Sequence, residues 1–188
     1  MLTVTATGVG LTYQWFSNTT ASNTGGTSLG AANGAQTATF TPPATIAGTT
    51  YYYVVVSGTC GNVTSAVSGA IIVNPNAFVS SVTGISAICI GLTTPYTANS
   101  VVLGGAGVGT WTSSNTAVAT VDASGVVTAV SAGTANITYT ISGGCGGTVS
   151  ASQTITIHPN AAITSVTGTA AICIGSTSQL TANGVVLG

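Results

Sequence analysis

The sequence predicts an all-β fold built of tandem two-layer β-sandwich domains, with no significant helix. Glu, Lys and Arg, which favour helices, are almost absent, whereas Thr, Val, Ile and Tyr, which favour strands, are frequent. Gly, Asn and Ser interrupt short alternating runs about every 8–12 residues, a spacing typical of antiparallel sandwiches and barrels. The clearest alternating runs are residues 2–6, 117–121, 136–141 and 154–157.

The scarcity of charge excludes whole classes of function. The 188 residues contain no Lys or Arg, one acidic residue, Asp122, and one histidine, His158. Nucleic-acid binding has no electrostatic basis without basic side chains, and a P-loop or a Schiff base lacks its lysine. One carboxylate cannot form a glycosidase pair or a carboxylate-rich calcium loop. We therefore expect no catalysis, no cofactor and no metal.

Hydropathy does not indicate a membrane-spanning helix. The mean hydropathy is +0.62, but the longest apolar run, Tyr51–Val56, has six residues, against about 20 in a spanning helix. Residues 1–20 lack a basic start and an apolar core, so no signal peptide is predicted.

An internal repeat defines the domains. Residues 75–104 reappear at 159–188, and 20 of these 30 positions are identical. One complete unit is therefore predicted at 77–160, and the proline-containing junctions lie at 74–76 and 158–160. Residues 1–74 are predicted to form a unit without its first strand, and 161–188 the first strands of a further repeat. Two explanations stay open: the chain is a window of a longer array, or its last strands complete a neighbouring copy.

The cysteines occupy repeated positions. Cys89 and Cys173 are equivalent early in a unit, and Cys60 and Cys145 are equivalent late in a unit. One cysteine of each kind per unit predicts a Cys89–Cys145 disulfide, with Cys60 and Cys173 paired outside the given chain or with neighbouring copies. A disulfide would place the protein outside the cytoplasm. The alternative is four free thiols.

The motifs of residues 110–138 resemble the bacterial Ig-like domain, group 2, found in intimin- and invasin-like adhesins. The first unit resembles Ig-like repeats of large Bacteroidota surface proteins, including gliding adhesins, through residues 12–18, 39–43 and 48–54. These resemblances imply Ig-like sandwiches stacked in a filament or adhesin stalk at the bacterial cell surface, without a catalytic residue. The motifs of the second unit are Thr110–Asn115, Ala117–Val121, Ser124–Ala129 and Ala132–Thr138.

Trp15 and Trp111 lie at the position of the buried tryptophan that packs on the intersheet disulfide of Ig domains, so we expect both in the core. Much of the alternating core face of the second unit is predicted to come from apolar side chains of four strands. They are Val118, Val121, Val127, Ile137, Tyr139, Ile155 and Ile157.

Other candidate sites have simpler explanations. The G-x-S-x-G pattern at 26–30 and the glycine-rich 105–109 are not followed by a helix, so neither fits a hydrolase elbow nor a phosphate loop. His158 is replaced by Asn74 at the other junction, which indicates a linker residue. Asp122 is expected to cap a turn.

The leading functional hypothesis is a non-catalytic structural segment of an extracellular bacterial filament or stalk, whose partners are neighbouring repeats or copies of itself. The alternatives are a carbohydrate- or ice-binding module and an accessory domain of a secreted enzyme. A binding module would use Thr3, Thr5 and Thr7 for ice, or an exposed aromatic platform for surface glycans. The candidate aromatics are Tyr13, Trp15, Phe16 and Tyr51 to Tyr53.

Overall fold

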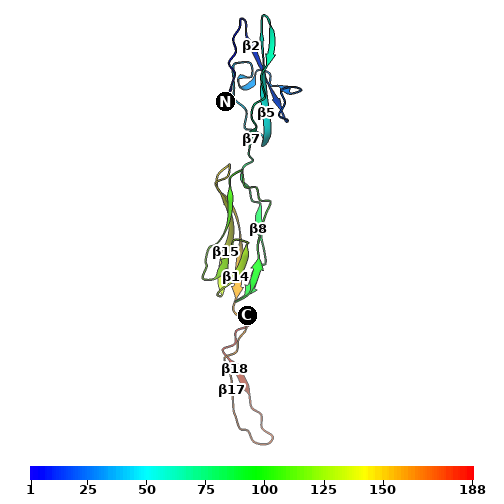
Figure 1. The fold of residues 1–188 in the computed structure, drawn as a ribbon. Coiled ribbons are helices and arrows are strands. Elements are labelled where there is room, and N and C mark those ends of the chain that lie inside the picture. The colour runs from blue at the N-terminus through cyan, green and yellow to red at the C-terminus, as the bar shows by residue number, and fades with distance from the viewer. The chain divides into compact units, whose positions relative to one another are not determined.

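The computed structural model describes all 188 residues and confirms an all-β fold. Its one helical element is a single 3-10 turn, η1 (Ala32–Gly34). No helix has the length and apolarity needed to cross a membrane. The chain forms two compact units, Met1–Pro75 and Asn76–Gly188 (Figure 1). The finer division into residues 1–74, 77–160 and 161–188 stays a prediction.

The first unit consists of a larger and a smaller antiparallel sheet. In the larger sheet, β5 is central: it pairs with β2 along one edge and with β6 and β7 along the other. The short strand β3 pairs with β2. The smaller sheet pairs β1 with β4. The strands are β1 (Leu2–Thr3), β2 (Thr12–Asn18), β3 (Thr27–Ser28), β4 (Thr39–Phe40), β5 (Gly48–Gly58), β6 (Gly61–Thr64) and β7 (Ile71–Val73).

Aromatic side chains from both sheets form the core of the first unit. Trp15 of β2 stacks on Phe40 of β4 with ring centroids 5.6 Å apart, and Phe40 contacts Tyr52 of β5 at 5.2 Å. All three side chains are buried, together with Val54. The alternation of β5 thus places large residues between the sheets, as expected for a half-buried strand.

Residues 76–160 of the second unit contain three groups of paired strands. The largest sheet has the order β12-β15-β16-β9, in which β9 runs parallel to the end of β16; the others are β10-β14-β13 and β11-β8. The strands of these residues are β8 (Ser81–Thr83), β9 (Ala87–Cys89), β10 (Thr93–Pro95), β11 (Thr97–Asn99), β12 (Val108–Ser113), β13 (Ala119–Val121), β14 (Val126–Ala129), β15 (Gly133–Ser142) and β16 (Val149–His158).

The predicted core of the second unit is largely confirmed. Five of the seven residues named from the sequence are buried, and Val121 and Tyr139 are partly buried against the same cluster. The cluster joins side chains of β13 and β14 to those of β15 and β16, which makes the unit a two-layer sandwich. The five buried residues are Val118, Val127, Ile137, Ile155 and Ile157.

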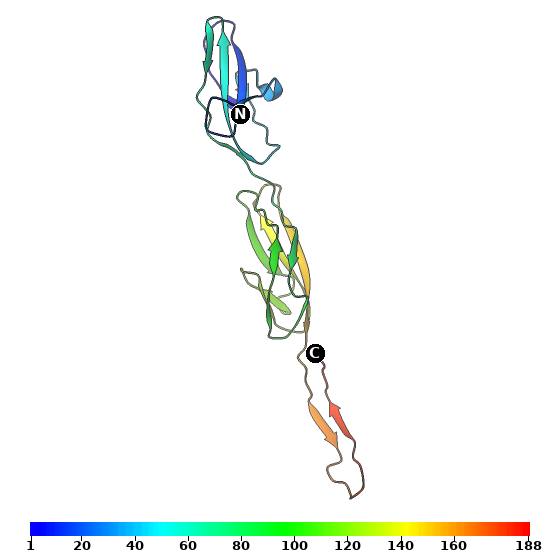
Figure 2. The same cartoon turned by 90° about the vertical axis from the view of Figure 1, so that its right-hand side faces the viewer.

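Residues 161–188 form a hairpin of β17 (Ser165–Gly168) and β18 (Leu180–Asn183) (Figure 2). Its pairing reproduces that of β8 with β11: Val166 lies opposite Ala182, as Val82 lies opposite Ala98. The repeated sequence therefore adopts the same local register in both places.

Replacing Ile155 by alanine tests the core of the second unit. The side chain is fully buried between the sheets, so its truncation should lower the free energy of unfolding by about 2–5 kcal/mol. Denaturant unfolding followed by fluorescence, in a Trp15→Phe background where Trp111 alone reports, measures this loss. Ser152→Ala, at an exposed position on the same strand, is the control and should change stability by less than about 0.5 kcal/mol. Equal losses in both variants would contradict the assignment.

Candidate functional site

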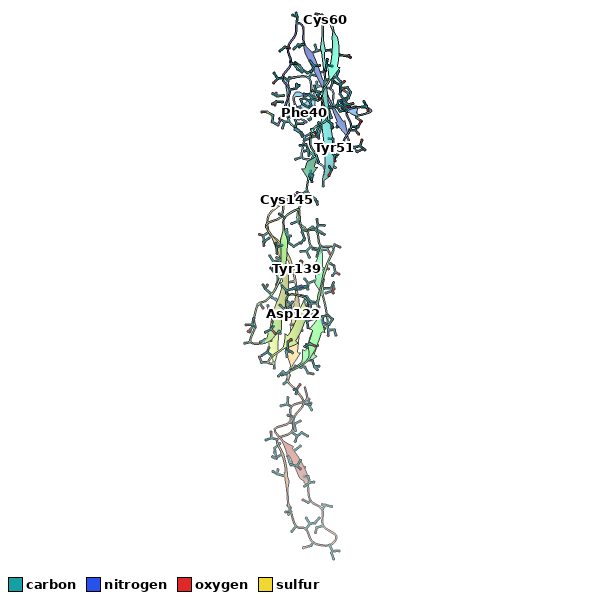
Figure 3. The ribbon with its side chains drawn as sticks, viewed as in Figure 1. Phe40, Tyr51, Cys60, Asp122, Tyr139 and Cys145 are labelled. Carbon is teal, nitrogen blue, oxygen red and sulfur yellow. The ribbon has the colours of Figure 1, made fainter.

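The four cysteines are all free thiols. Cys145 lies in the loop between β15 and β16, where its N–H donates to the carbonyl of Gly104 at 2.9 Å and its carbonyl accepts from the N–H of Ala77 at 2.7 Å. Cys89 ends β9, opposite His158 at the end of β16. Figure 3 shows Cys60 in the corresponding loop of the first unit, between β5 and β6.

The prediction of a Cys89–Cys145 disulfide is wrong in this structure. Cys145 precedes the first residue of β16 and Cys89 lies beside its last, and the ten residues of that strand span about 30 Å. A disulfide needs Cα atoms within about 7 Å. The repeat correctly identified equivalent positions, but equivalence between units says nothing about proximity within a unit. Pairing of Cys60 and Cys173 outside the chain stays a prediction.

Both tryptophans pack on aromatic rings, and no disulfide lies beside them. Trp15 is buried and its Nε1–H donates to the carbonyl of Thr37 at 3.0 Å. Trp111 is only partly buried and meets Tyr139 edge to face, with ring centroids 4.9 Å apart. Trp111 was expected in the core, and the structure places it at the edge of the core instead.

Asp122 has the turn role predicted for it. Its Oδ1 accepts hydrogen bonds from the hydroxyl of Ser124 at 2.7 Å, and from the N–H groups of Ser124 and Val126, both at 2.9 Å. The Ser124 hydroxyl bond, with the backbone bond of Val126 next in size, holds the pKa of this carboxyl below its ordinary value of 3.8. The turn connects β13 to β14, so the only side-chain carboxylate of the chain has a local structural task.

The other polar side chains considered as candidate site residues do not lie together in one site. No three His, Cys, Asp or Glu side chains lie close enough together to hold a metal ion. His158 is exposed at the end of β16, and Asp122 caps its turn. Residues 26–30 include the short edge strand β3 in place of a strand-turn-helix elbow, and residues 105–109 lead into β12.

Three of the six aromatic side chains of the platform proposed from the sequence are buried, and the other three are partly buried. Tyr52 and Tyr53 are buried along with Trp15. Phe16 stacks on Tyr53 with centroids 5.1 Å apart, and the Tyr53 hydroxyl accepts from the N–H of Gly26 at 3.1 Å. The aromatics thus stabilise the larger sheet. Of the threonine row, only Thr3 lies in a strand, so the row does not extend into a flat array.

Tyr96 is a core residue that the sequence analysis did not single out. It lies between β10 and β11 in the sequence, and its ring is buried in the core cluster of the second unit. Its hydroxyl donates to the carbonyl of Ile85 at 2.8 Å. Burial raises the pKa of this phenol, because a desolvated tyrosinate is disfavoured. Leu180 holds the equivalent place in the repeat, and this apolar pair was the available signal.

The first unit also has an open apolar groove with a volume of about 770 Å³. One wall is the segment from Val4 to Leu11, and the other is the end of β5, the following turn and β6. The lining contains no charged side chain. Its apolar members are Val4, Ala6, Val9, Leu11, Val56 and Val63.

Replacing Cys89 and Cys145 by serine, singly and together, tests the free-thiol state. No bond joins these sulfurs, so each single variant should lower the free energy of unfolding only slightly. The loss in the double variant should equal the sum of the two single losses. Denaturant midpoints under oxidising and reducing conditions provide the measurement. A large loss shared by both single variants and abolished by reductant would contradict the structure.

Acidification should weaken the second unit through Asp122. The folded-state pKa lies below the unfolded-state value near 3.8, so this contribution is present above that pH and is lost as the pH falls through the folded-state pKa. Denaturant unfolding between about pH 2 and 6 should show this loss. Asp122→Asn keeps the acceptor oxygen but cannot titrate, so its acid slope should be smaller. Parallel profiles would contradict the assignment.

Comparison with known proteins identifies a family for part of the chain. Residues 91–152 match the bacterial Ig-like domain (group 2), and residues 1–75 match a domain of unknown function, DUF8696. No curated protein matches the chain significantly.

Solved structures of the surface layer protein SbsC are similar at low identity. Its domains 1–6 match with 13% identity and a TM-score of 0.30 over 84% of this chain and 21% of that chain. Its domains 4–9 match with 15% identity and a TM-score of 0.31, over 88% and 25% of the respective chains. A longer SbsC structure matches with 16% identity and a TM-score of 0.30, over 98% and 31%. The chain thus spans between a fifth and a third of these structures.

The family match falls within the second unit and includes all the motifs from which the resemblance was stated, residues 110–138. The resemblance of the first unit to repeats of Bacteroidota surface proteins stays a prediction. The second unit contains a match to the bacterial Ig-like domain family, group 2, as the sequence motifs predicted.

Proposed function

We propose that this chain is a non-catalytic structural segment of an extracellular bacterial filament or adhesin stalk, exposed at the cell surface. The observation that carries the proposal is the bacterial Ig-like match at residues 91–152. Domains of this kind act as spacers when they are joined in series, since each one folds around its own core. The repeat of residues 75–104 at 159–188 supports such a series.

The chemistry of the side chains supports a mechanical role. The chain offers no lysine or arginine, its single carboxylate caps a turn, and its thiols lie in separate places. A general acid, a general base and a nucleophile would have to meet within hydrogen-bond distance for acyl or glycosyl transfer. The groove of the first unit has apolar walls and no charged side chain to orient a substrate.

The surface chemistry suits an environment of varying salt. Ionic strength weakens interactions between exposed charges, and this surface has almost none. A net charge of −1 also leaves little repulsion between neighbouring copies, which favours association. Neighbouring repeats, or copies of the same chain, are therefore the partners we propose.

Immunogold labelling of intact cells that carry the gene tests the proposed location. An antibody raised against residues 76–160 should label the surface of unpermeabilised cells, along any filament that extends from it. An antibody against a cytoplasmic protein is the control and should label only permeabilised cells. Labelling of this chain that also requires permeabilisation would contradict the proposal.

A further inference from the structure

The outer face of the larger sheet in the first unit carries a hollow with a volume of about 510 Å³, separate from the apolar groove. Side chains alternate along β2 and β5, so this face points away from the buried Trp15 and Val54. The lining contains no charged side chain. The outward side chains that line this outer-face hollow are Thr12, Gln14 and Phe16 of β2, Val55 and Ser57 of β5, and Gln36 of the turn after η1.

Phe16 supplies the aromatic part of the outer-face hollow, and the sheet holds its ring in place. The ring stacks on that of Tyr53, the residue opposite in β5, with centroids 5.1 Å apart and planes inclined by 4°. Tyr53 is 5% exposed, and its hydroxyl accepts from the N–H of Gly26 at 3.1 Å. Phe16 itself is only partly buried. A ring that is already fixed can pack on the C–H groups of a ligand without losing further conformational freedom.

Gln14 supplies an oriented hydrogen-bond acceptor. Its Nε2 donates to the carbonyls of Trp15 and Gly30, both at 3.0 Å, so both hydrogens of the amide are used inside the chain. Its Oε1 has no partner in the chain and remains free to accept from a ligand hydroxyl. Because the two Nε2 bonds fix the plane of the amide, this acceptor is oriented before a ligand arrives.

The other polar side chains of the outer-face hollow can donate as well as accept. Gln36 is exposed, so its amide is available in both senses. Thr12 and Ser57 lie opposite each other, and the Thr12 hydroxyl donates to the carbonyl of Ser57 at 3.5 Å, a long and therefore weak bond. Closely spaced neutral donors and acceptors match the adjacent hydroxyls of a sugar. An anionic ligand would find no cationic partner, because the chain has no Lys or Arg.

The second unit has different residues on the equivalent face. Trp15 lies opposite Val54 as Trp111 lies opposite Tyr139, which aligns β2 with β12 and β5 with β15. The second unit keeps the same strand pairing without an aromatic pair or an amide on this face, so the sheet itself does not require them. By this alignment, Phe16 and Tyr53 correspond to Thr112 and Thr138, and Gln14 and Val55 correspond to Thr110 and Thr140.

We propose that the outer-face hollow binds a neutral saccharide, with the C–H face of one pyranose ring packed on Phe16 and its hydroxyls bonded to Gln14 and Gln36. Its volume of about 510 Å³ lies within the range of about 300–1,000 Å³ that is common for small-molecule sites. An open hollow with few polar groups gives weak binding, in the millimolar range. The inference goes beyond the proposed function, because it adds recognition of a glycan to a structural segment and is tested on the purified chain.

NMR titration of the isotope-labelled full chain tests the proposal with four neutral disaccharides: cellobiose, maltose, lactose and diacetylchitobiose. At least one should shift backbone amide signals in a saturable manner, with a Kd in the millimolar range. The shifted signals should come from residues 12–16, 36 and 55–57. Digalacturonate, an anionic disaccharide, is the control ligand and should shift none of them.

Two variants test the residues assigned to the outer-face hollow. Gln36→Ala should weaken binding about 5-fold through the loss of one neutral hydrogen bond, and its exposed side chain means that folding is retained. Phe16→Thr introduces the residue type of the second unit and should weaken binding at least about 10-fold. Thr64→Ala is the matched control. Thr64 is exposed on the neighbouring strand β6, opposite Val55, but does not line the hollow, so affinity should not change.

Four outcomes would overturn the proposal. They are the absence of saturable shifts with all four neutral disaccharides, equal binding of digalacturonate, shifts that map to the apolar groove in place of the outer-face hollow, and unchanged affinity in both Gln36→Ala and Phe16→Thr. Thermal unfolding of each variant, followed by tryptophan fluorescence, separates a lost contact from a lost fold. Gln36→Ala keeps the test decisive if Phe16→Thr fails to fold.

Discussion

Burial of apolar side chains between two β layers is the interaction on which this fold depends. With no lysine or arginine and a single carboxylate, ion pairs cannot contribute to its stability. The core residues of the second unit, such as Ile137 and Ile155, are fully buried, and each buried aliphatic side chain contributes about 1.5–3 kcal/mol. Backbone pairing between strands satisfies the polar groups that accompany this burial.

Periodicity was enough to predict the fold class and most of the core, because in a strand the side-chain direction alternates with every residue. Ile155 and Ile157 could be placed inside for this reason alone. Tertiary distance could not be predicted in the same way. The repeat predicted a bond between Cys89 and Cys145. The parallel pairing of β9 with the end of β16 instead places these residues at opposite ends of the sheet.

The difference between the two tryptophans has a similar origin. Each tryptophan is followed closely by a run of Ser, Thr and Asn residues, so the sequence pattern gives no reason to expect different burial of the two side chains. Trp15 meets Phe40 from the opposite sheet and is enclosed, whereas Trp111 meets Tyr139 of the adjacent strand in its own sheet. A neighbour in the same sheet cannot cover the Trp111 ring from the opposite layer. Whether a tryptophan meets a ring of its own sheet or of the opposite sheet cannot be predicted from the alternation of apolar residues. The open groove was equally hidden, since it is defined by what does not pack there.

Edge strands explain why such a groove matters in this chain. Natural β proteins protect exposed edges with charged side chains, especially lysine, with proline or with bulges. Lysine is not available here, and the segment from Val4 to Val9 contains no proline. An isolated two-stranded hairpin is also at best marginally stable in water, and β17 with β18 leaves Ile163 and Val166 exposed. Without charged side chains to protect them, the exposed strands of this chain depend on strand pairing and apolar burial.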